Sequence, residues 1–270
     1  WLKPAPCLDR RPNGTGAMAA KPILITVPVG NNPARIRLLI YLKGLEEEID
    51  MKTPYDYGGL QSEEYLKINP QGKMPALIMP DGTCFFEARV ISGYICDRWH
   101  SVGPSLRAST PEARALSAMI NQVHDLYIAS ANSSDSSVTP TQGCMYKPVE
   151  VIDAPSRAVK VKEVYKQLGV LEGLVAGPYC SGDELTEADL AVYPTFLFIT
   201  FMMPRVFGWK AVLEERPKLK AWMAKMEELP AVVRVRDEVV PALEGWESSG
   251  RFTAIIQQVK DAPDLKWVYP

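Results

Sequence analysis

Short apolar runs alternate with amphipathic stretches over residues 21–105, and this alternation restricts the fold more than any other feature of the sequence. A β-branched run bounded by prolines is typical of a buried strand, and a 3.6-residue apolar period is typical of a helix. These patterns predict strands at 23–27, 47–51, 76–79 and 84–86, and helices at 34–43, 62–68 and 87–99. The order βαβαββα predicts a mixed four-stranded sheet with helices on its faces.

The helix predicted at 34–43 follows a Gly-Asn-Asn-Pro turn and ends at Gly44, which is expected to be its C-cap. Its apolar residues fall on one face, and its basic residues are expected to point outward: Arg35, Arg37 and Lys43. The last two strands are joined by Pro-Asp-Gly, a combination that favours a tight hairpin.

From Pro111 onward the periodicity is helical, with helices predicted at 112–131, 156–174, 187–201, 218–229 and 231–246. The uncharged run 190–204 is shorter than the ~20 residues that cross a bilayer, so we expect a buried helix there. The stretch 132–155 is rich in Ser, Thr and Pro and predicts either a functional loop or a long connection. The expected organisation is therefore an extended tail, an α/β domain, an all-α domain and a second tail, at 1–20, 21–105, 106–247 and 248–270.

Charge and composition narrow the classes of partner. The 270 residues include 30 basic and 32 acidic side chains, a formal net charge of −2, which gives no footprint for nucleic acid and no polybasic surface for membranes. Five cysteines contain no CxxC pair, and neither of the two histidines lies in a cluster of ligand residues, so we expect no metal site. A small molecule or a protein is the expected partner.

Two motifs carry a resemblance to a known family. The segment Asn69–Pro75, followed by a hairpin and then Phe86–Ile91, resembles the glutathione-site region of cytosolic-type glutathione S-transferases. The segment Ser181–Leu190 resembles the capping-box region before the central helix of that family's second domain. The resemblance covers about residues 22–246. It implies a thioredoxin-like N-terminal domain, glutathione as co-substrate without a metal, and a homodimer.

The resemblance also implies a glutathione site. The proline matching Pro75 is cis in the family, and the backbone of Met74 would pair with the extended tripeptide. Glu87 would meet the γ-glutamyl amine, although a structural role at a helix start is an alternative. Ala88 stands where the family has a serine that binds the γ-glutamyl carboxylate, which implies weaker binding. Lys73 would reach the glycyl carboxylate, or else is a solvated surface charge.

The thiol-activating residue is the main departure from the family pattern. Family enzymes use a Tyr in the first strand, or a Ser or Cys at the start of the first helix, and none of these is present here. Some members carry Asn at this point, which makes Asn32 the first candidate and Asn31 the second. The alternative is an ordinary turn with an Asn helix cap. Tyr127 is the candidate for the second-substrate side.

The capping box is expected to be structural. Thr186 and Asp189 form a Thr-x-x-Asp pattern that satisfies free N–H groups at a helix start, and we expect no chemistry from them. An aromatic and Met-rich set in or after this helix is interpreted as core, with an electrophile pocket as the alternative: Tyr193, Phe196, Phe198, Phe201, Met202, Met203 and Trp209.

Two functions remain open from the sequence. The first is a glutathione transferase of the detoxification type, which uses the glutathione thiolate on an apolar electrophile. The alternative is a non-catalytic subunit with the same fold, held in a larger assembly that orders its tails. The start at Trp1 fits either a shortened chain or a mature end left by presequence removal, so a soluble location in the cytosol or in an organelle stroma such as that of a plastid is expected.

Overall fold

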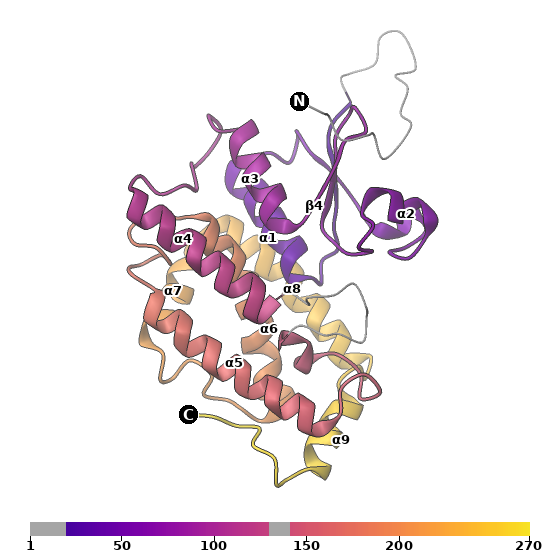
Figure 1. Ribbon diagram of the computed structural model, residues 1–270, viewed down its shortest axis with the longest axis vertical. Coiled ribbons are helices and arrows are strands. Elements are labelled where there is room, and N and C mark those ends of the chain that lie inside the picture. The colour runs from indigo at the N-terminus through magenta and orange to yellow at the C-terminus, as the bar shows by residue number, and fades with distance from the viewer. Residues whose placement is uncertain (1–19, 130–140) are drawn as a thin grey trace. The chain divides into compact units, whose positions relative to one another are not determined.

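The computed structural model describes residues 20–129 and 141–270, and these fall into two compact units that divide between Ser105 and Leu106 (Figure 1). Most of the predicted N-terminal tail and the first part of the stretch 132–155 lie outside the described residues.

The first unit is built on a four-stranded mixed sheet. Its strands are β1 (Ile23–Ile25), β2 (Asp50–Lys52), β3 (Ala76–Ile78) and β4 (Cys84–Phe86), in the spatial order β2-β1-β3-β4. Strand β1 pairs parallel with β2 and antiparallel with β3, and β3 pairs antiparallel with β4. The helices are α1 (Asn31–Lys43), the 3₁₀ turn η1 (Pro54–Tyr57), α2 (Glu63–Ile68) and α3 (Ala88–Arg98). This confirms the predicted βαβαββα order and the thioredoxin-like fold.

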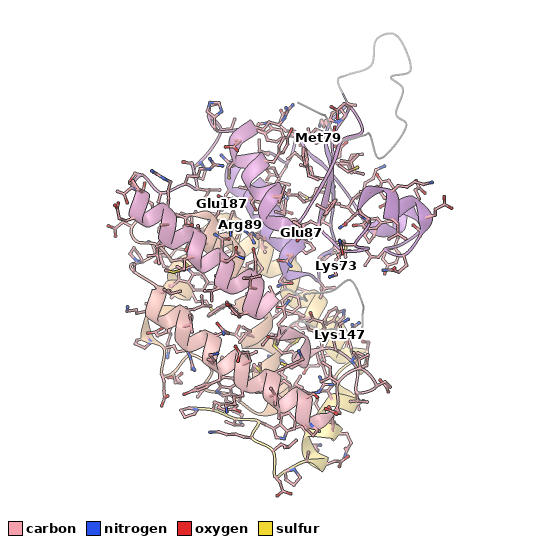
Figure 2. All side chains as sticks on the ribbon, viewed as in Figure 1. Lys73, Met79, Glu87, Arg89, Lys147 and Glu187 are labelled. Atoms are coloured by element: carbon pink, nitrogen blue, oxygen red, sulfur yellow. The ribbon has the colours of Figure 1, made fainter. Side chains whose placement is uncertain are left out.

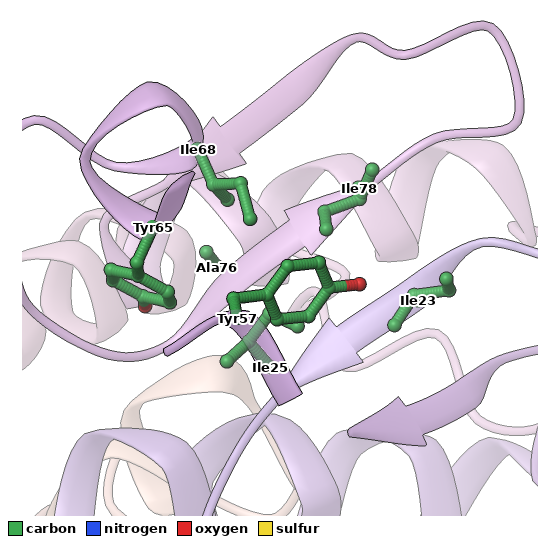
Figure 3. Packing of buried hydrophobic residues seen from close by; sticks show 7 residues of the cluster. All are labelled: Ile23, Ile25, Tyr57, Tyr65, Ile68, Ala76 and Ile78. Atoms are coloured by element: carbon green, nitrogen blue, oxygen red, sulfur yellow. The ribbon is translucent and has the colours of Figure 1, made fainter. Parts of the chain in front are cut away.

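Apolar side chains fill both faces of the sheet. Because successive side chains of a strand point to opposite faces, alternate residues of β1 and β3 share one face with α2 and η1. The cluster on this face is shown in Figure 3 and consists of Ile23, Ile25, Tyr57, Tyr65, Ile68, Ala76 and Ile78. Leu24 and Leu77 belong to the other face and are also fully buried. Two buried faces explain why these strands are continuous apolar runs rather than alternating ones.

The expectation that the basic residues of α1 point outward is wrong. Arg35, Arg37 and Lys43 are 1 %, 3 % and 2 % exposed. The Lys43 ammonium donates to the carbonyls of Trp99, Val102 and Pro104 at 3.1, 2.7 and 3.0 Å, and its burial lowers its pKa. The loop after α3 thus leaves carbonyls that need donors, which a reading of helical periodicity cannot reveal.

The regular elements of the second unit, among its described residues, are all helices, and one isolated β-bridge joins Tyr179 to Gly182. The unit contains α4 (Pro111–Val123), a π-helical turn η2 (His124–Ala129), the 3₁₀ turn η3 (Thr141–Met145), α5 (Ala154–Leu174), α6 (Glu187–Phe207), α7 (Pro217–Met226), α8 (Pro230–Ser248) and α9 (Thr253–Asp261). This confirms the predicted all-helical domain. Helix α4 ends earlier than predicted because the chain widens into η2, and α6 runs on to Phe207 with Pro204 inside it.

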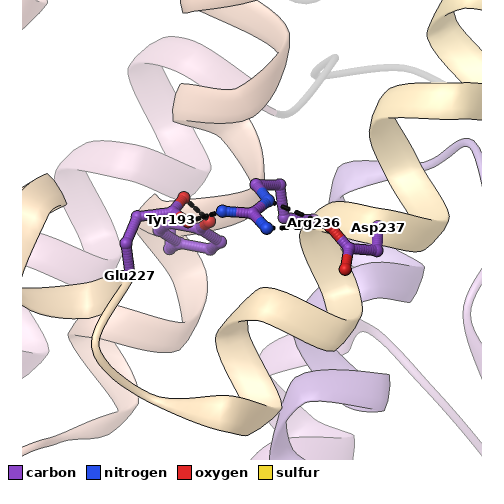
Figure 4. Close-up of polar contacts among 4 residues, drawn as sticks. All are labelled: Tyr193, Glu227, Arg236 and Asp237. Atoms are coloured by element: carbon purple, nitrogen blue, oxygen red, sulfur yellow. Dashed lines mark hydrogen bonds and ion pairs between the residues drawn. The ribbon is translucent and has the colours of Figure 1, made fainter.

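Helix α6 is the core of the second unit. It is the one helix among the described residues that is long and apolar enough to cross a membrane, but 83 % of its most apolar window is buried within the fold. The aromatic and Met-rich set is buried, as expected for core. Tyr193 donates to Glu227, which also accepts from Arg236 at 2.5 Å, and Arg236 pairs in turn with Asp237 (Figure 4). Burial raises the pKa of Tyr193.

Residues 248–270, expected to be a tail, are part of the folded second unit, and α9 packs on α6. They include α9, and Trp267 and Tyr269 beyond it are each 7 % exposed. Tyr269 stacks on Tyr165 and Trp267 on Phe207, with ring centroids 4.8 and 5.8 Å apart.

Candidate functional site

One end of the sheet gathers the candidate residues of the first unit. The register aligns Ile25, Ala76 and Phe86 in one row across β1, β3 and β4. Because β3 runs antiparallel to its neighbours, the residues before Ala76 and those after Phe86 extend from the same end of the sheet. Figure 2 shows Lys73 and Glu87 at this end and Met79 at the other.

The segment before β3 is held by α2. The Tyr65 hydroxyl and the Asn69 amide both donate to the carbonyl of Lys73, each at 2.7 Å. Asn69 also accepts from the N–H of Gln71 at 3.0 Å, which closes the turn. Tyr65 is fully buried, and burial raises its pKa, so it remains a neutral donor. These bonds fix the backbone at residue 73 while the Lys73 side chain stays exposed.

Met74 follows directly, and its peptide bond with Pro75 is cis, as the resemblance implies. Pro75 is buried and Met74 is half-buried. Neither the N–H nor the carbonyl of Met74 bonds to another described residue. A backbone edge with free groups beside a sheet can accept an extended peptide as an added strand.

The start of α3 is open and its first residue is strained. Glu87 is the N-cap, its side chain makes no cap hydrogen bond, and its backbone has φ = 70°. Such a conformation is costly for a residue with a Cβ and persists where the surrounding structure imposes it, typically at ligand sites. Glu87 is exposed and Ala88 is buried. The helix start therefore offers uncapped N–H groups and a carboxylate to a ligand that carries both charges.

The start of α1 lies beyond the end of β1. Gly30, with extended backbone, is the N-cap, so Asn31 and Asn32 occupy the first turn and neither is the cap. The Asn-cap alternative of the sequence analysis is thereby replaced. Asn32 is half-buried, and its amide makes no hydrogen bond with another described residue. Its side chain and the helix-start N–H groups are donors suited to an anion such as a thiolate.

The capping box closes the start of α6 in the second unit. Asp189 accepts from four donors: Cys180 N at 2.7 Å, Thr186 N at 2.8 Å, Thr186 Oγ1 at 3.0 Å and Trp222 Nε1 at 2.8 Å. Burial raises the pKa of the Asp189 carboxyl, against the hydrogen bonds that lower it. Both oxygens of this carboxylate are therefore bonded to groups of the second unit itself.

Tyr127 also belongs to the second unit. It lies in the π-helical turn η2 and is 52 % exposed; the same turn holds the buried His124, which bonds to the half-buried Asp125. The structure therefore places it on a different unit from the glutathione candidates. No group of three or more potential metal ligands occurs in the part of the chain that the structure describes.

Comparison with known proteins identifies the family. Models of the N-terminal and C-terminal domains of glutathione S-transferases match residues 24–97 and 137–230. Glutathione S-transferase 3 of Zea mays is 30 % identical over 212 residues, which cover 77 % of this chain and 90 % of the maize protein. The chain belongs to the glutathione S-transferase family.

Other relatives agree with this assignment. The glutathione S-transferase-like protein OpS6 of Beauveria bassiana is 26 % identical over 210 residues, 76 % of this chain and 90 % of that protein. Among solved structures, Gtt2 of Saccharomyces cerevisiae matches with a TM-score of 0.63 at 21 % identity, over 79 % of this chain and 99 % of that one. A glutathione transferase family member from Pseudomonas fluorescens, with two glutathiones bound, matches with a TM-score of 0.64 at 22 % identity, over 80 % and 92 %.

Two residues of this glutathione S-transferase fold have structural roles that were not predicted from the sequence. Tyr65, within the helix predicted at 62–68, anchors the Lys73 carbonyl. Arg37, expected outward, instead binds the connection after β1. The prolines at positions 28 and 33 are the signal that was available, since a connection bounded by prolines has few N–H groups of its own and needs outside donors.

Proposed function

We propose that the chain is a glutathione transferase that binds glutathione at the end of the sheet formed by residues 73–75 and 87–88 and uses its thiolate on an apolar electrophile. The observation that carries the proposal is the start of α3. Glu87 holds a strained backbone with φ = 70° and no cap bond, which a purely structural helix start does not require.

The tripeptide would bind through three kinds of contact. The backbone of its cysteinyl residue pairs with the free N–H and carbonyl of Met74. Its γ-glutamyl carboxylate takes the uncapped N–H groups of α3 and its amine meets Glu87. Lys73 is the partner of the glycyl carboxylate. The glutathiones bound in the structurally similar proteins from Pseudomonas fluorescens and Burkholderia graminis support this choice of ligand.

The start of α1 would activate the thiol. Donation from the amide of Asn32, with Asn31 as the second donor, favours the thiolate and lowers the pKa of the bound thiol. The thiolate sulfur then forms a bond to the electrophilic carbon, whose displaced electron pair leaves with a leaving group or takes up a proton. An amide is a weaker donor to an anion than an ionised group, so a modest rate is expected.

Ala88 sets the affinity in this proposal. A serine hydroxyl at this position would add one hydrogen bond to the γ-glutamyl carboxylate, a contribution of about 1–2 kcal/mol for a charged acceptor. Without it, binding relies on the helix N–H groups and Glu87. Glutathione affinity is therefore expected to be lower than that of an otherwise equal site with serine.

The proposal also covers the second substrate, the assembly and the compartment. Tyr127 is proposed for the second-substrate side, with an apolar electrophile as its ligand. A homodimer is proposed as the assembly, since symmetric dimers are the commonest soluble oligomers. The proposed setting is a soluble compartment, either the cytosol or an organelle stroma, where millimolar thiols are kept reduced.

Calorimetric titration with glutathione, followed by a conjugation assay with a generic electrophile, tests the proposal. Glu87→Ala is expected to weaken binding about ten-fold, and Asn32→Ala to lower the rate more than the affinity. Glu64→Ala, an exposed acidic residue in the first turn of α2, is the matched control and should change neither. Absence of binding to the unmodified chain at millimolar glutathione would reject the transferase and favour a non-catalytic subunit.

A further inference from the structure

Arg37 holds the chain segment that leads to the proposed thiol-activating turn. Its Nη1 donates to Thr26 Oγ1 at 2.8 Å and to the Val27 carbonyl at 2.5 Å, and its Nη2 donates to the Pro28 carbonyl at 2.9 Å. These three acceptors are consecutive residues. One guanidinium, on a side chain that is 3 % exposed and lies on the second turn of α1, therefore binds the first three residues of the connection between β1 and α1.

Sheet hydrogen bonds do not hold this connection beyond its first residue. The last sheet-type bond on this side runs from Thr26 N to the Lys52 carbonyl at 2.8 Å. Beyond it Pro28 has no N–H, and regular structure resumes only at Asn31. Burying a guanidinium is costly unless its donors are satisfied, and here at least three of its bonds go to this one segment.

The bonds also orient the local dipoles. Because the carbonyls of Val27 and Pro28 accept from Arg37, their negative ends point at the guanidinium. Both carbonyl oxygens therefore face a fixed positive charge. The turn at 30–32 can then present donors, since a rigid connection holds the Asn amides and the helix-start N–H groups in one arrangement.

We propose that Arg37 is a positioning residue for thiol activation, which it serves by fixing residues 26–28 so that Asn31 and Asn32 face the glutathione sulfur. The inference rests on the proposed function and assigns a task within the same site. Arg37 touches neither the substrate nor the sulfur in this account. Its effect reaches the thiol through the backbone of the connection. Mutation of Arg37 is therefore expected to change the pKa of the bound thiol more than the affinity for glutathione.

The test is the ultraviolet absorbance of the glutathione thiolate, followed against pH in complexes with the unmodified chain, Arg37→Gln and Arg37→Lys. Arg37→Gln is expected to raise the pKa of the bound thiol by about one unit and to lower kcat about ten-fold with a smaller change in KM. Arg37→Lys, which keeps the charge but cannot grip the segment with a planar fork, is expected to restore part of the shift.

Arg157→Gln is the matched control. Arg157 is a fully buried arginine of the second unit whose guanidinium also binds backbone carbonyls, among them those of Cys144, Lys147 and Ile152. Its replacement should lower thermal stability and leave the thiol pKa unchanged. Thr26→Val removes one acceptor without touching the arginine and should shift the thiol pKa slightly in the same direction as Arg37→Gln.

The outcomes separate cleanly. A thiolate signal in the unmodified chain with an unchanged pKa in folded Arg37→Gln and in Thr26→Val would overturn the inference and leave the transferase standing. If Arg37→Gln does not fold, the shift in Thr26→Val decides by its presence or absence. Lack of any thiolate signal in the unmodified chain would overturn the proposed function and the inference with it.

Discussion

Helices α3 and α6 both begin beside an acidic side chain, yet the two starts are built in opposite ways. At α6 the carboxylate of Asp189 is fully buried and takes four donors from its own chain. At α3 the carboxylate of Glu87 is exposed, makes no cap bond and stands on a backbone with φ = 70°. In the first arrangement the polar groups bond to one another and stabilise the fold. In the second they remain open to a ligand, and the backbone is strained.

A structural helix start and a ligand-binding one should therefore respond differently to mutation. Mutation of a closed start should lower the stability of the fold and leave ligand affinity unchanged. Mutation of an open start should leave the stability unchanged or raise it, and should weaken ligand binding. Each of the following predictions tests one side of this comparison.

Asp189→Asn should give the largest effect. The amide retains the shape but replaces an acceptor oxygen with a donor NH₂ among buried N–H groups, so donors are left unsatisfied at about 1–3 kcal/mol each. We expect a loss of about 3 kcal/mol or more in the free energy of unfolding, measured by urea denaturation. Asp183→Asn, exposed in the loop before the same helix, should change it by less than about 0.5 kcal/mol. A comparable loss in both variants would contradict the closed-start account.

Glu87→Gly should separate stability from binding. Glycine adopts positive φ without steric cost, so the unfolding free energy is expected to rise by about 1 kcal/mol. Glutathione affinity should fall about ten-fold because the carboxylate that meets the ammonium is gone. Urea denaturation and calorimetry on the same preparation measure the two effects. A variant that loses stability would show that Glu87 supports the fold, as the structural alternative holds.

Much of this contrast could be predicted from the sequence, and part of it could not. The Thr186–Asp189 pair is a local pattern with a fixed spacing, so its structural role follows from sequence alone. The backbone of Glu87 is set by the junction of β4 with α3, a tertiary constraint that leaves no mark in residue type. The same holds for the buried basic residues of α1, whose acceptors lie as far away as Pro104.

Boundaries show the same division. The order of strands and helices along the chain follows from alternating apolar patterns, which are short-range. The start of α1 at Asn31 instead of residue 34 depends on Gly30 acting as the cap, whereas the sequence offered an asparagine cap as one alternative. Burial of Trp267 and Tyr269 comes from packing on distant rings and has no periodic signal.

Ala88→Ser should strengthen glutathione binding at the start of α3. The added hydroxyl supplies one donor to the γ-glutamyl carboxylate, and glutathione affinity is expected to rise about five-fold, equal to about 1 kcal/mol. Gly93→Ser adds the same side chain on the same helix, at a position where a new Cβ meets no atom within 4 Å. That control is expected to change stability through helix propensity and leave the affinity unchanged.

Asp153 gives the smallest effect and extends the comparison to a closed but exposed start. It caps α5 by accepting from Ser156 N at 2.8 Å, and hydrogen bonds from Ser156 hold the pKa of its carboxyl below the ordinary value of 3.8. A depressed pKa in the folded state means that the contribution to stability is present above pH 3.8 and is lost as the pH falls through the folded pKa. The Tm difference between the unmodified chain and Asp153→Ala should therefore shrink in acid.

Amide hydrogen exchange with and without glutathione tests the central contrast most directly, because it reads both helix starts in one experiment. Saturating glutathione is expected to slow exchange at residues 87–91 and 73–74 and to leave exchange at residues 186–190 unchanged. Unaltered exchange at residues 87–91 under conditions where calorimetry records binding would contradict this expectation, since the ligand would then be held elsewhere than at the open start of α3.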